Sequence, residues 1–433
     1  MDIKKINILT LGCSKNLVDS EKLSKQIEAA GFKVVNDSDD TSYSTVIINT
    51  CGFINDAKEE SIDTILRFAS LREKGLIKNI YVMGCLAERY MEELSSGIPE
   101  VRRWFGVKNT EDILAELGGS LRKELYSDRI LTGPVHYAYL KVSEGCDRSC
   151  AFCAIPLIRG RCISRPVEEI VDEARLLATK GVKELILIAQ DLSYYGLDLY
   201  KKRMLPRLLE RLLDLKSFEW IRLHYLYPAD FPREVISLMK AYPVICRYID
   251  IPIQHISDSM LRRMKRSHDR RETEELLYHI RQELPGAAIR TTLIAGHPGE
   301  TEKEYSELAE FVRSFRFDRL GVFPYSNEEG TWSFKNYSDD IPQATKEARV
   351  SELMEIQQEI ASELNESMKG RVLKVIIDRR EGEYHIGRTE YDSPDVDQEV
   401  LIPAEYDVKE GSFCQVKITR TEGFDLYGVP VSS

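Results

Sequence analysis

Three cysteines in the middle of the chain have a spacing that suits one shared inorganic cofactor. Cys146, Cys150 and Cys153 form the pattern C-x3-C-x2-C within EGCDRSCAFCAIPLIRGRC. Cysteine thiolates are the usual protein ligands of iron–sulfur clusters. Because three thiolates leave one iron of a four-iron cluster without a protein ligand, that iron can bind a small chelating molecule. The alternative is a zinc-binding loop, but a structural zinc site normally has a fourth protein ligand.

A cluster iron without a protein ligand indicates radical chemistry. The amino and carboxylate groups of S-adenosylmethionine are suited to chelating it, and an electron passed to the sulfonium then releases a 5′-deoxyadenosyl radical. The cofactor carries this chemistry, whereas the protein binds and orients it. We therefore expect Cys146, Cys150 and Cys153 to be the catalytic ligands of the cluster.

A second set of cysteines is spread over the first hundred residues. Cys13, Cys51 and Cys85 each follow a short apolar run, in TLGC, INTC and VMGC. Helical stretches separate these runs, which predicts a small parallel sheet. Sites in such sheets form at the carboxyl ends of the strands. We therefore expect the three cysteines to lie at one edge, the alternative being three unrelated buried core cysteines.

Periodicity divides the chain into three domains. We predict an α/β domain at 1–125, a linker at 126–136, a core at 137–368 and a small all-β barrel of the OB-like type at 369–433. The core has six βα units, fewer than the eight of a closed barrel, and so predicts a partial, open (βα)6 barrel. The predicted strands are 6–11, 46–49 and 80–83, then 137–142, 184–189, 220–224, 248–251, 289–294 and 319–323, and finally 372–378, 383–388, 400–402, 413–419 and 426–429.

Composition narrows the classes of protein further. The net charge is −11, whereas a general nucleic-acid binder usually carries a basic excess. No apolar run reaches the roughly 20 residues of a membrane helix, and the first residues do not form a secretory signal. Nine cysteines in such a chain indicate metal binding or catalysis rather than disulfides. We therefore expect a cytoplasmic protein with no membrane partner.

Together these motifs resemble the radical S-adenosylmethionine superfamily and, within it, the methylthiotransferases. The resemblance covers nearly the whole chain, including a C-terminal barrel of the TRAM kind that would bind substrate. It implies a second four-iron cluster on Cys13, Cys51 and Cys85, which presents or gives up the sulfur. The expected cofactors are therefore two [4Fe-4S] clusters and S-adenosylmethionine.

Two branches of that family differ in substrate, and three features favour the branch that modifies an aspartate of small-subunit ribosomal protein twelve. The run AIPLIRGRCISR resembles that branch, and Asp191 in IAQDLSYYG stands where the branch that modifies a tRNA adenosine more often has Asn. The segment after Lys369 holds eight Lys and Arg against thirteen Asp and Glu, a net charge of −5. An acidic surface suits a lysine-rich protein better than a phosphate backbone.

Five further residues are candidates for contacts with S-adenosylmethionine. Gln190 and Asp191 end the second core strand, where the resemblance places the methionine end of the cofactor. Arg222, near the end of the third strand, is suited to a carboxylate or ribose, although an ion pair is an equal alternative. Gly296 and Gly299 would let the backbone approach the adenine or ribose, the alternative being a tight turn.

The resemblance implies insertion of a methylthio group at the β-carbon of the aspartate. A flavodoxin or ferredoxin-type protein would donate electrons, and the ribosome or an assembly intermediate would be a further partner. Two alternative functions remain. One is a tRNA adenosine methylthiotransferase, and the other, from another class, is an iron–sulfur protein for RNA binding or electron transfer without radical chemistry.

Overall fold

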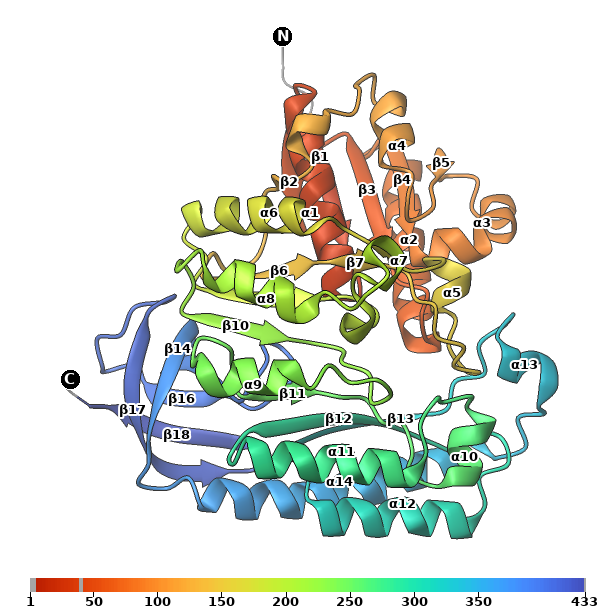
Figure 1. Cartoon of the computed structure of the whole chain (residues 1–433). Coiled ribbons are helices and arrows are strands. Elements are labelled where there is room, and N and C mark those ends of the chain that lie inside the picture. The colour runs from red at the N-terminus through yellow and green to blue at the C-terminus, as the bar shows by residue number, and fades with distance from the viewer. Residues whose placement is uncertain (1–4, 39–41, 432–433) are drawn as a thin grey trace.

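The computed structural model describes residues 5–38 and 42–431 of the 433-residue chain, so residues 1–4 of the predicted first domain lie outside the described residues. Three parts follow one another, as predicted. In Figure 1 the N-terminal sheet lies above the core, and the C-terminal barrel lies at the lower left. No helix in the described part of the chain combines the length and apolar character that crossing a bilayer requires.

The N-terminal domain is a five-stranded parallel sheet of order β2-β1-β3-β4-β5 with helices on both faces. Sequence periodicity predicted its three inner strands and missed the two edge strands, of which one is mostly half-buried and the other has two residues. The helices α1 and α4 pack on one face, whereas α2 and α3 pack on the other. The elements are β1 (Lys5–Thr10), α1 (Ser14–Ala29), β2 (Lys33–Asn36), β3 (Thr45–Thr50), α2 (Asn55–Glu73), β4 (Asn79–Gly84), α3 (Cys85–Gly97), β5 (Arg103–Trp104) and α4 (Thr110–Glu116).

The predicted linker is fixed between the two domains that it joins. The short 3-10 turn η1 (Lys123–Leu125) directly precedes it. The Arg129 side chain is fully buried and forms ion pairs with Glu21 of α1 and Glu173 of the core helix α6 (Val167–Thr179). Because a buried cation is tolerated only when it is paired, this arginine fixes the N-terminal domain against the core.

The core is an open wall of six strands, which confirms the predicted partial barrel. All pairings within the sheets β10-β9-β6 and β11-β12-β13 are parallel. Between the two sheets, an isolated parallel bridge pairs Ile221 of β10 with Ile245, which lies shortly before β11. The strands are β6 (Tyr137–Lys141), β9 (Glu184–Ile188), β10 (Trp220–Leu223), β11 (Tyr248–Asp250), β12 (Ala288–Ala295) and β13 (Arg319–Pro324).

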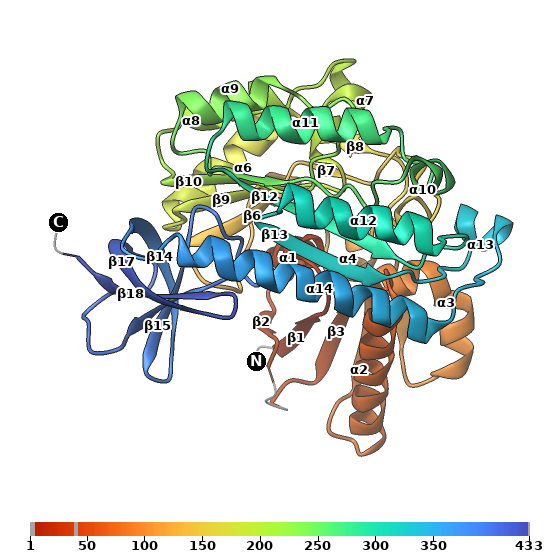
Figure 2. The same ribbon diagram turned by 90° about the horizontal axis from the view of Figure 1, so that it is seen from below.

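Helices cover the outer face of this wall and bury its apolar side chains in one large cluster. The long helix α14 runs along the core and ends at the C-terminal barrel (Figure 2). Shorter elements shape the loops at the carboxyl ends of the strands. The remaining core elements are β7 (Ser143–Glu144), α5 (Ile155–Ile158), β8 (Ile163–Ser164), η2 (Leu192–Tyr194), α7 (Leu197–Tyr200), α8 (Leu205–Leu213), α9 (Glu234–Ala241), α10 (Asp258–Arg263), α11 (Arg270–Glu283), α12 (Glu302–Phe315), α13 (Trp332–Asn336) and α14 (Gln343–Glu366).

The C-terminal domain is a closed five-stranded barrel of order β14-β15-β16-β18-β17, as predicted. Alternating apolar side chains fill its interior, which gives it a core separate from that of the larger domain. Its strands are β14 (Val372–Glu381), β15 (Tyr384–Thr389), β16 (Val400–Pro403), β17 (Phe413–Glu422) and β18 (Asp425–Pro430).

Candidate functional site

The three N-terminal cysteines lie where the sequence predicted them, at the carboxyl ends of adjacent parallel strands. Cys13 caps α1 just after β1, Cys51 directly follows β3, and Cys85 is the first residue of α3 after β4. Glycines let these strand ends approach closely. A Cβ atom at Gly12 would lie 2.6 Å from the Cβ of Cys51, and one at Gly52 would lie 2.7 Å from the backbone nitrogen of Leu86.

One side chain that sequence reasoning missed organises this edge of the sheet. The buried amide of Asn16, near the start of α1, donates to the carbonyl oxygens of Leu11 and Thr50 at 2.8 and 3.1 Å. Its Oδ1 lies 3.8 Å from the Sγ of Cys85. Asn16 thus contacts the ends of β1 and β3 and the first residue of α3, which sets the relative positions of the three cysteine-bearing loops.

Burial and charge set the state of these thiols. Cys51 and Cys85 are buried, whereas Cys13 is exposed. Burial raises the pKa of Cys51, and it raises the pKa of Cys85 to about 12, with the guanidinium of Arg159 opposing that rise. Both thiols are therefore protonated at neutral pH in the free protein, and metal binding would release their protons.

The central cysteine triad lies in a loop that follows the first core strand. The short antiparallel pair β7–β8 closes this loop, and the amide of Cys146 donates to the carbonyl of Gly160 at 3.1 Å. The amide of Ala151 donates to the carbonyl of Met264 at 2.8 Å. The backbone therefore holds the loop in place, and burial raises the pKa of both Cys146 and Cys153 to about 12.

Two arginines surround the triad and supply N–H donors to its sulfurs. The guanidinium of Arg266 donates to the Sγ of Cys150 at 3.3 Å, and the backbone amide of Arg148 donates to the Sγ of Cys146 at 3.4 Å. Both guanidinium groups lie about 4 Å from the ring centroid of Tyr227. Hydrogen bonds to cluster sulfurs and nearby cations tune a cluster's potential, so these contacts fit a redox group.

Two of the predicted cofactor contacts lie beside this loop. Gln190 follows β9, and its amide nitrogen donates to Glu144 at 3.0 Å, while its buried Oε1 has no partner among the described residues. Asp191 accepts a hydrogen bond from Arg148 at 2.7 Å and another from Ser193 at 2.5 Å. The structure thus brings Gln190 and Asp191 to the same end of the core as the triad.

The other three predicted contacts have partners within the protein. Arg222 is fully buried, pairs with Glu184 at 2.7 Å and also donates to two carbonyl oxygens of the C-terminal domain. We propose that it joins that domain to the core rather than holding the cofactor. A Cβ at Gly296 would lie 2.3 Å from Cγ of Lys346, and one at Gly299 would lie 2.7 Å from the guanidinium of Arg263. These close contacts explain both glycines, whose approach to a cofactor stays a prediction.

Both cysteine sets consist of thiols, which are the usual protein ligands of iron–sulfur clusters. Each set offers three thiols with an arginine beside one of them, Arg159 at Cys85 and Arg266 at Cys150. Both sets therefore fit four-iron clusters.

The two cysteine sets lie on different domains, and two groups of polar contacts join these domains. In the first group, Arg159 of the triad loop donates to Asn16 of the N-terminal domain. In the second group, Glu328, after β13, forms ion pairs with Lys58 of α2 at 3.0 Å and Arg89 of α3 at 2.6 Å. Sequence reasoning missed Glu328, because its partners are more than 200 residues away.

An open wall of six parallel strands with a three-cysteine loop after its first strand defines a radical S-adenosylmethionine enzyme core. Residues 140–312 match the family described as the Radical SAM superfamily. Residues 5–106 match Uncharacterized protein family UPF0004, and residues 370–431 match the TRAM domain. The class predicted from the cysteine spacing is confirmed.

Full-length relatives show which family within this class the chain resembles. The chain is 56% identical over 423 residues, 98% of each chain, to the "Ribosomal protein uS12 methylthiotransferase RimO" of Phocaeicola vulgatus. It is 56% identical over 429 residues, 99% of each, to the protein of the same name from Bacteroides fragilis, and 53% identical over 427 residues to that of Flavobacterium psychrophilum. The chain belongs to the family of ribosomal protein uS12 methylthiotransferases, as predicted, and the tRNA branch is not favoured.

Solved structures support the fold alone, because their sequences are distant. The radical S-adenosylmethionine methyltransferase TsrM from Kitasatospora setae, with cobalamin and a [4Fe-4S] cluster bound, has a TM-score of 0.54 at 15% identity over 75% of each chain. The cobalamin-dependent radical enzyme OxsB has a TM-score of 0.51 at 14% identity, over 83% of this chain and 62% of that one.

Proposed function

We propose that this chain transfers a methylthio group to ribosomal protein uS12 and places it on the β-carbon of an aspartate. The observation that carries the proposal is identity above one half, over essentially the full length, with relatives named for that activity on that protein. The two cysteine sets support it, because the reaction needs both a radical and a source of sulfur.

The cofactors provide the reactive species. When bound, a four-iron cluster on Cys146, Cys150 and Cys153 supplies the electron that cleaves S-adenosylmethionine, and a second one on the N-terminal cysteines, Cys13, Cys51 and Cys85, supplies or holds the sulfur. The protein binds, orients and shields these groups.

Side chains beside the triad would orient S-adenosylmethionine. The buried Oε1 of Gln190 has no partner among the described residues, so it is suited to accept a hydrogen bond from the amino group of the methionine end. Asp191 fixes the guanidinium of Arg148, which lies over the ring of Tyr227. Arg148 and Asp191 together would keep the loop rigid while the cofactor binds.

We infer three further properties from the substrate and the reaction. Cleavage of S-adenosylmethionine consumes an electron, so a low-potential flavodoxin or ferredoxin-type protein would deliver it. The substrate is a ribosomal protein, so the ribosome or an assembly intermediate would be the form that presents it. Both partners place the reaction in the cytoplasm.

Co-expression with uS12 tests the proposal. Mass spectrometry should find one aspartate of uS12 whose mass has increased by the exchange of hydrogen for a methylthio group. Cys150→Ala should abolish both this product and 5′-deoxyadenosine, whereas Cys51→Ala should abolish only the methylthio product. Cys414→Ala, in the C-terminal barrel, is the matched control and should keep both.

Two results would overturn the proposal. If the reconstituted, reduced protein makes no 5′-deoxyadenosine, the chain is not a radical enzyme. If uS12 stays unmodified while a tRNA adenosine gains the methylthio group, the substrate is wrong.

A further inference from the structure

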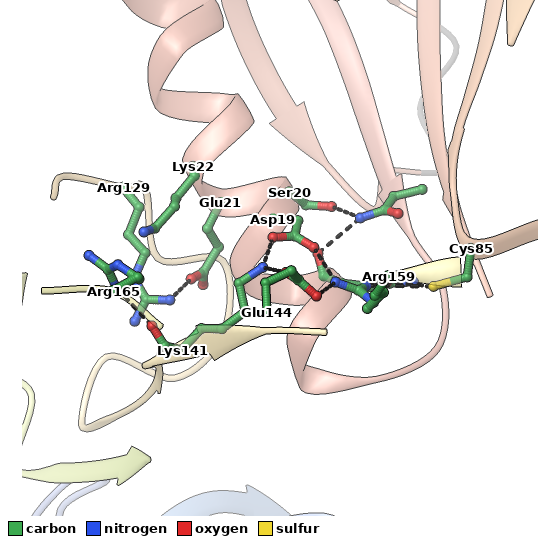
Figure 3. A network of polar contacts seen from close by, with 12 residues as sticks. Asp19, Ser20, Glu21, Lys22, Cys85, Arg129, Lys141, Glu144, Arg159 and Arg165 are labelled. Atoms are coloured by element: carbon green, nitrogen blue, oxygen red, sulfur yellow. Dashed lines mark hydrogen bonds and ion pairs between the residues drawn. The ribbon is translucent and has the colours of Figure 1, made fainter. Parts of the chain in front are cut away.

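The triad loop contributes one side chain that leaves its own domain. Arg159 directly follows α5, six positions after Cys153, and is 2% exposed. Its guanidinium contacts α1 and the first residue of α3, both in the N-terminal domain (Figure 3). Sequence motifs do not reveal this contact, because the residues it joins are 74 to 143 positions apart.

The two terminal nitrogens of Arg159 have different partners. Nη1 forms ion pairs with Asp19 at 3.1 Å and with Glu144 at 2.7 Å. Nη2 donates to Oδ1 of Asn16 at 2.6 Å and to the Sγ of Cys85 at 3.5 Å. The rigid planar fork of an arginine suits such divided contacts: one nitrogen is held by carboxylates, and the other is thereby aimed at the sulfur.

The surrounding charges keep this buried cation stable. Lys141 forms ion pairs with both Asp19 and Glu144, so two cations face two carboxylates (Figure 3). A guanidinium stays protonated in proteins, and the ion pairs with Asp19 and Glu144 compensate the burial of this one. The site therefore presents a permanent positive charge and an N–H donor to Cys85.

We propose that Arg159 is a positioning residue that orients Cys85 and stabilises the reduced form of the cluster held by the N-terminal cysteines. The inference rests on the proposed second cluster. A cation and an N–H donor at a ligand sulfur favour the more negative, reduced form of a cluster, which raises its reduction potential. Because Arg159 belongs to the triad loop, this effect depends on the two domains being docked.

Arg266, the arginine beside Cys150, differs from Arg159 in which domain supplies its partners. Arg266 donates to Cys150, but its other contacts, with Pro252 and His268, lie within the core. Arg159 instead takes its charge partners from both domains, Asp19 from one and Glu144 from the other. It therefore links the loop of one cysteine set to a ligand of the other.

A potentiometric titration tests the role of Arg159. The full chain is prepared with Cys146, Cys150 and Cys153 all replaced by Ala, so that only the N-terminal cluster forms, and its potential is followed by electron paramagnetic resonance. Arg159→Gln removes the charge and should shift the potential to a more negative value. Arg159→Lys keeps the charge but loses the fork, and should give a smaller shift in the same direction.

The control is Arg161→Gln in the same background. Arg161 lies two positions away, its side chain is 90% exposed, and it pairs only with Asp147 among the described residues. Its replacement should leave the potential unchanged. If the cluster forms and neither Arg159 variant shifts its potential, the inference fails while the proposed function stands. If no iron binds in the background itself, the second cluster and the inference fail together.

Discussion

At the scale of single residues, burial keeps one histidine of the core neutral. His297, after β12, is fully buried, with Nε2 3.1 Å from the hydroxyl of Ser333 and its ring 4.9 Å from that of Tyr325. Burial lowers the pKa of His297 from 6.5 to about 4. The folded protein therefore holds this histidine neutral at a pH where the unfolded chain would protonate it.

This lowered pKa predicts a loss of stability in mild acid. Between pH 6.5 and 4 the unfolded chain binds a proton at His297 that the folded chain does not. The free energy of unfolding is therefore at its full value above pH 6.5 and falls as the pH drops toward 4. The expected loss from pH 7 to pH 5 is about 2 kcal/mol. His297→Gln should remove that part of the loss, measured by calorimetry at pH 7, 6 and 5.

A matched variant isolates the effect of burial. His279, on the partly exposed face of α11, is replaced by Gln in parallel as the control for the substitution itself. An identical fall in melting temperature for the parent and His297→Gln would contradict the prediction.

At the scale of elements, the site depends on how three strand ends are joined. Replacing Asn16 by Ala removes the donors to Leu11 and Thr50 and one partner of Arg159. A lost buried hydrogen bond costs about 1–3 kcal/mol, enough to loosen the loops that carry Cys13 and Cys51. After reconstitution we expect iron to fall from about eight to about four per chain.

The control for Asn16→Ala is Asn55→Ala, an exposed position at the start of α2. It should keep about eight irons. Iron and sulfide analysis of both variants checks the prediction, and a full complement of iron in Asn16→Ala would show that the strand ends hold their geometry without the amide.

The sequence alone predicted the strands and cysteines of the site but not all of its contacts. Strands with continuous apolar runs, such as β3, and their terminal cysteines were predictable, because strand direction fixes which ends share an edge. The residues that complete the site were not. Asn16 is a polar residue of α1 whose partners at the three strand ends are 5 to 69 positions away. Arg159 meets α1 only when elements 143 positions apart come together. Pattern and spacing carry local information, whereas these contacts depend on how the strands and domains pack.

The predicted substrate surface of the C-terminal barrel illustrates the same limit. Its net charge of −5 predicts an acidic surface, yet the carboxylates of Asp392 and Asp397 are buried and that of Asp378 nearly so. They pair with Arg319, Arg290 and Arg388 respectively. Part of the acidity therefore serves the fold rather than a partner, a distinction that a charge count does not make.

At the scale of the whole molecule, the C-terminal barrel is part of the core's architecture. The segment between β15 and β16 reaches into the core, where Asp392 accepts hydrogen bonds from Arg319, and Asp397 accepts one from Tyr248 at 2.7 Å. Ser393 lies 2.9 Å from Nε2 of His224. These partners come from several core strands, so the segment braces the inside of the open wall.

This docking predicts that one buried carboxylate stabilises the joined domains. Removing the charge of Asp392, whose side chain is fully buried, breaks its ion pair with the guanidinium of Arg319. Breaking a buried ion pair costs about 3–5 kcal/mol, so Asp392→Asn should lower the melting temperature and raise hydrogen exchange in β15, β16 and the segment between them. Asp407→Asn, on a partly exposed loop of the same barrel, should change neither. Unchanged exchange in Asp392→Asn would mean that the remaining contacts hold the barrel on the core without this pair.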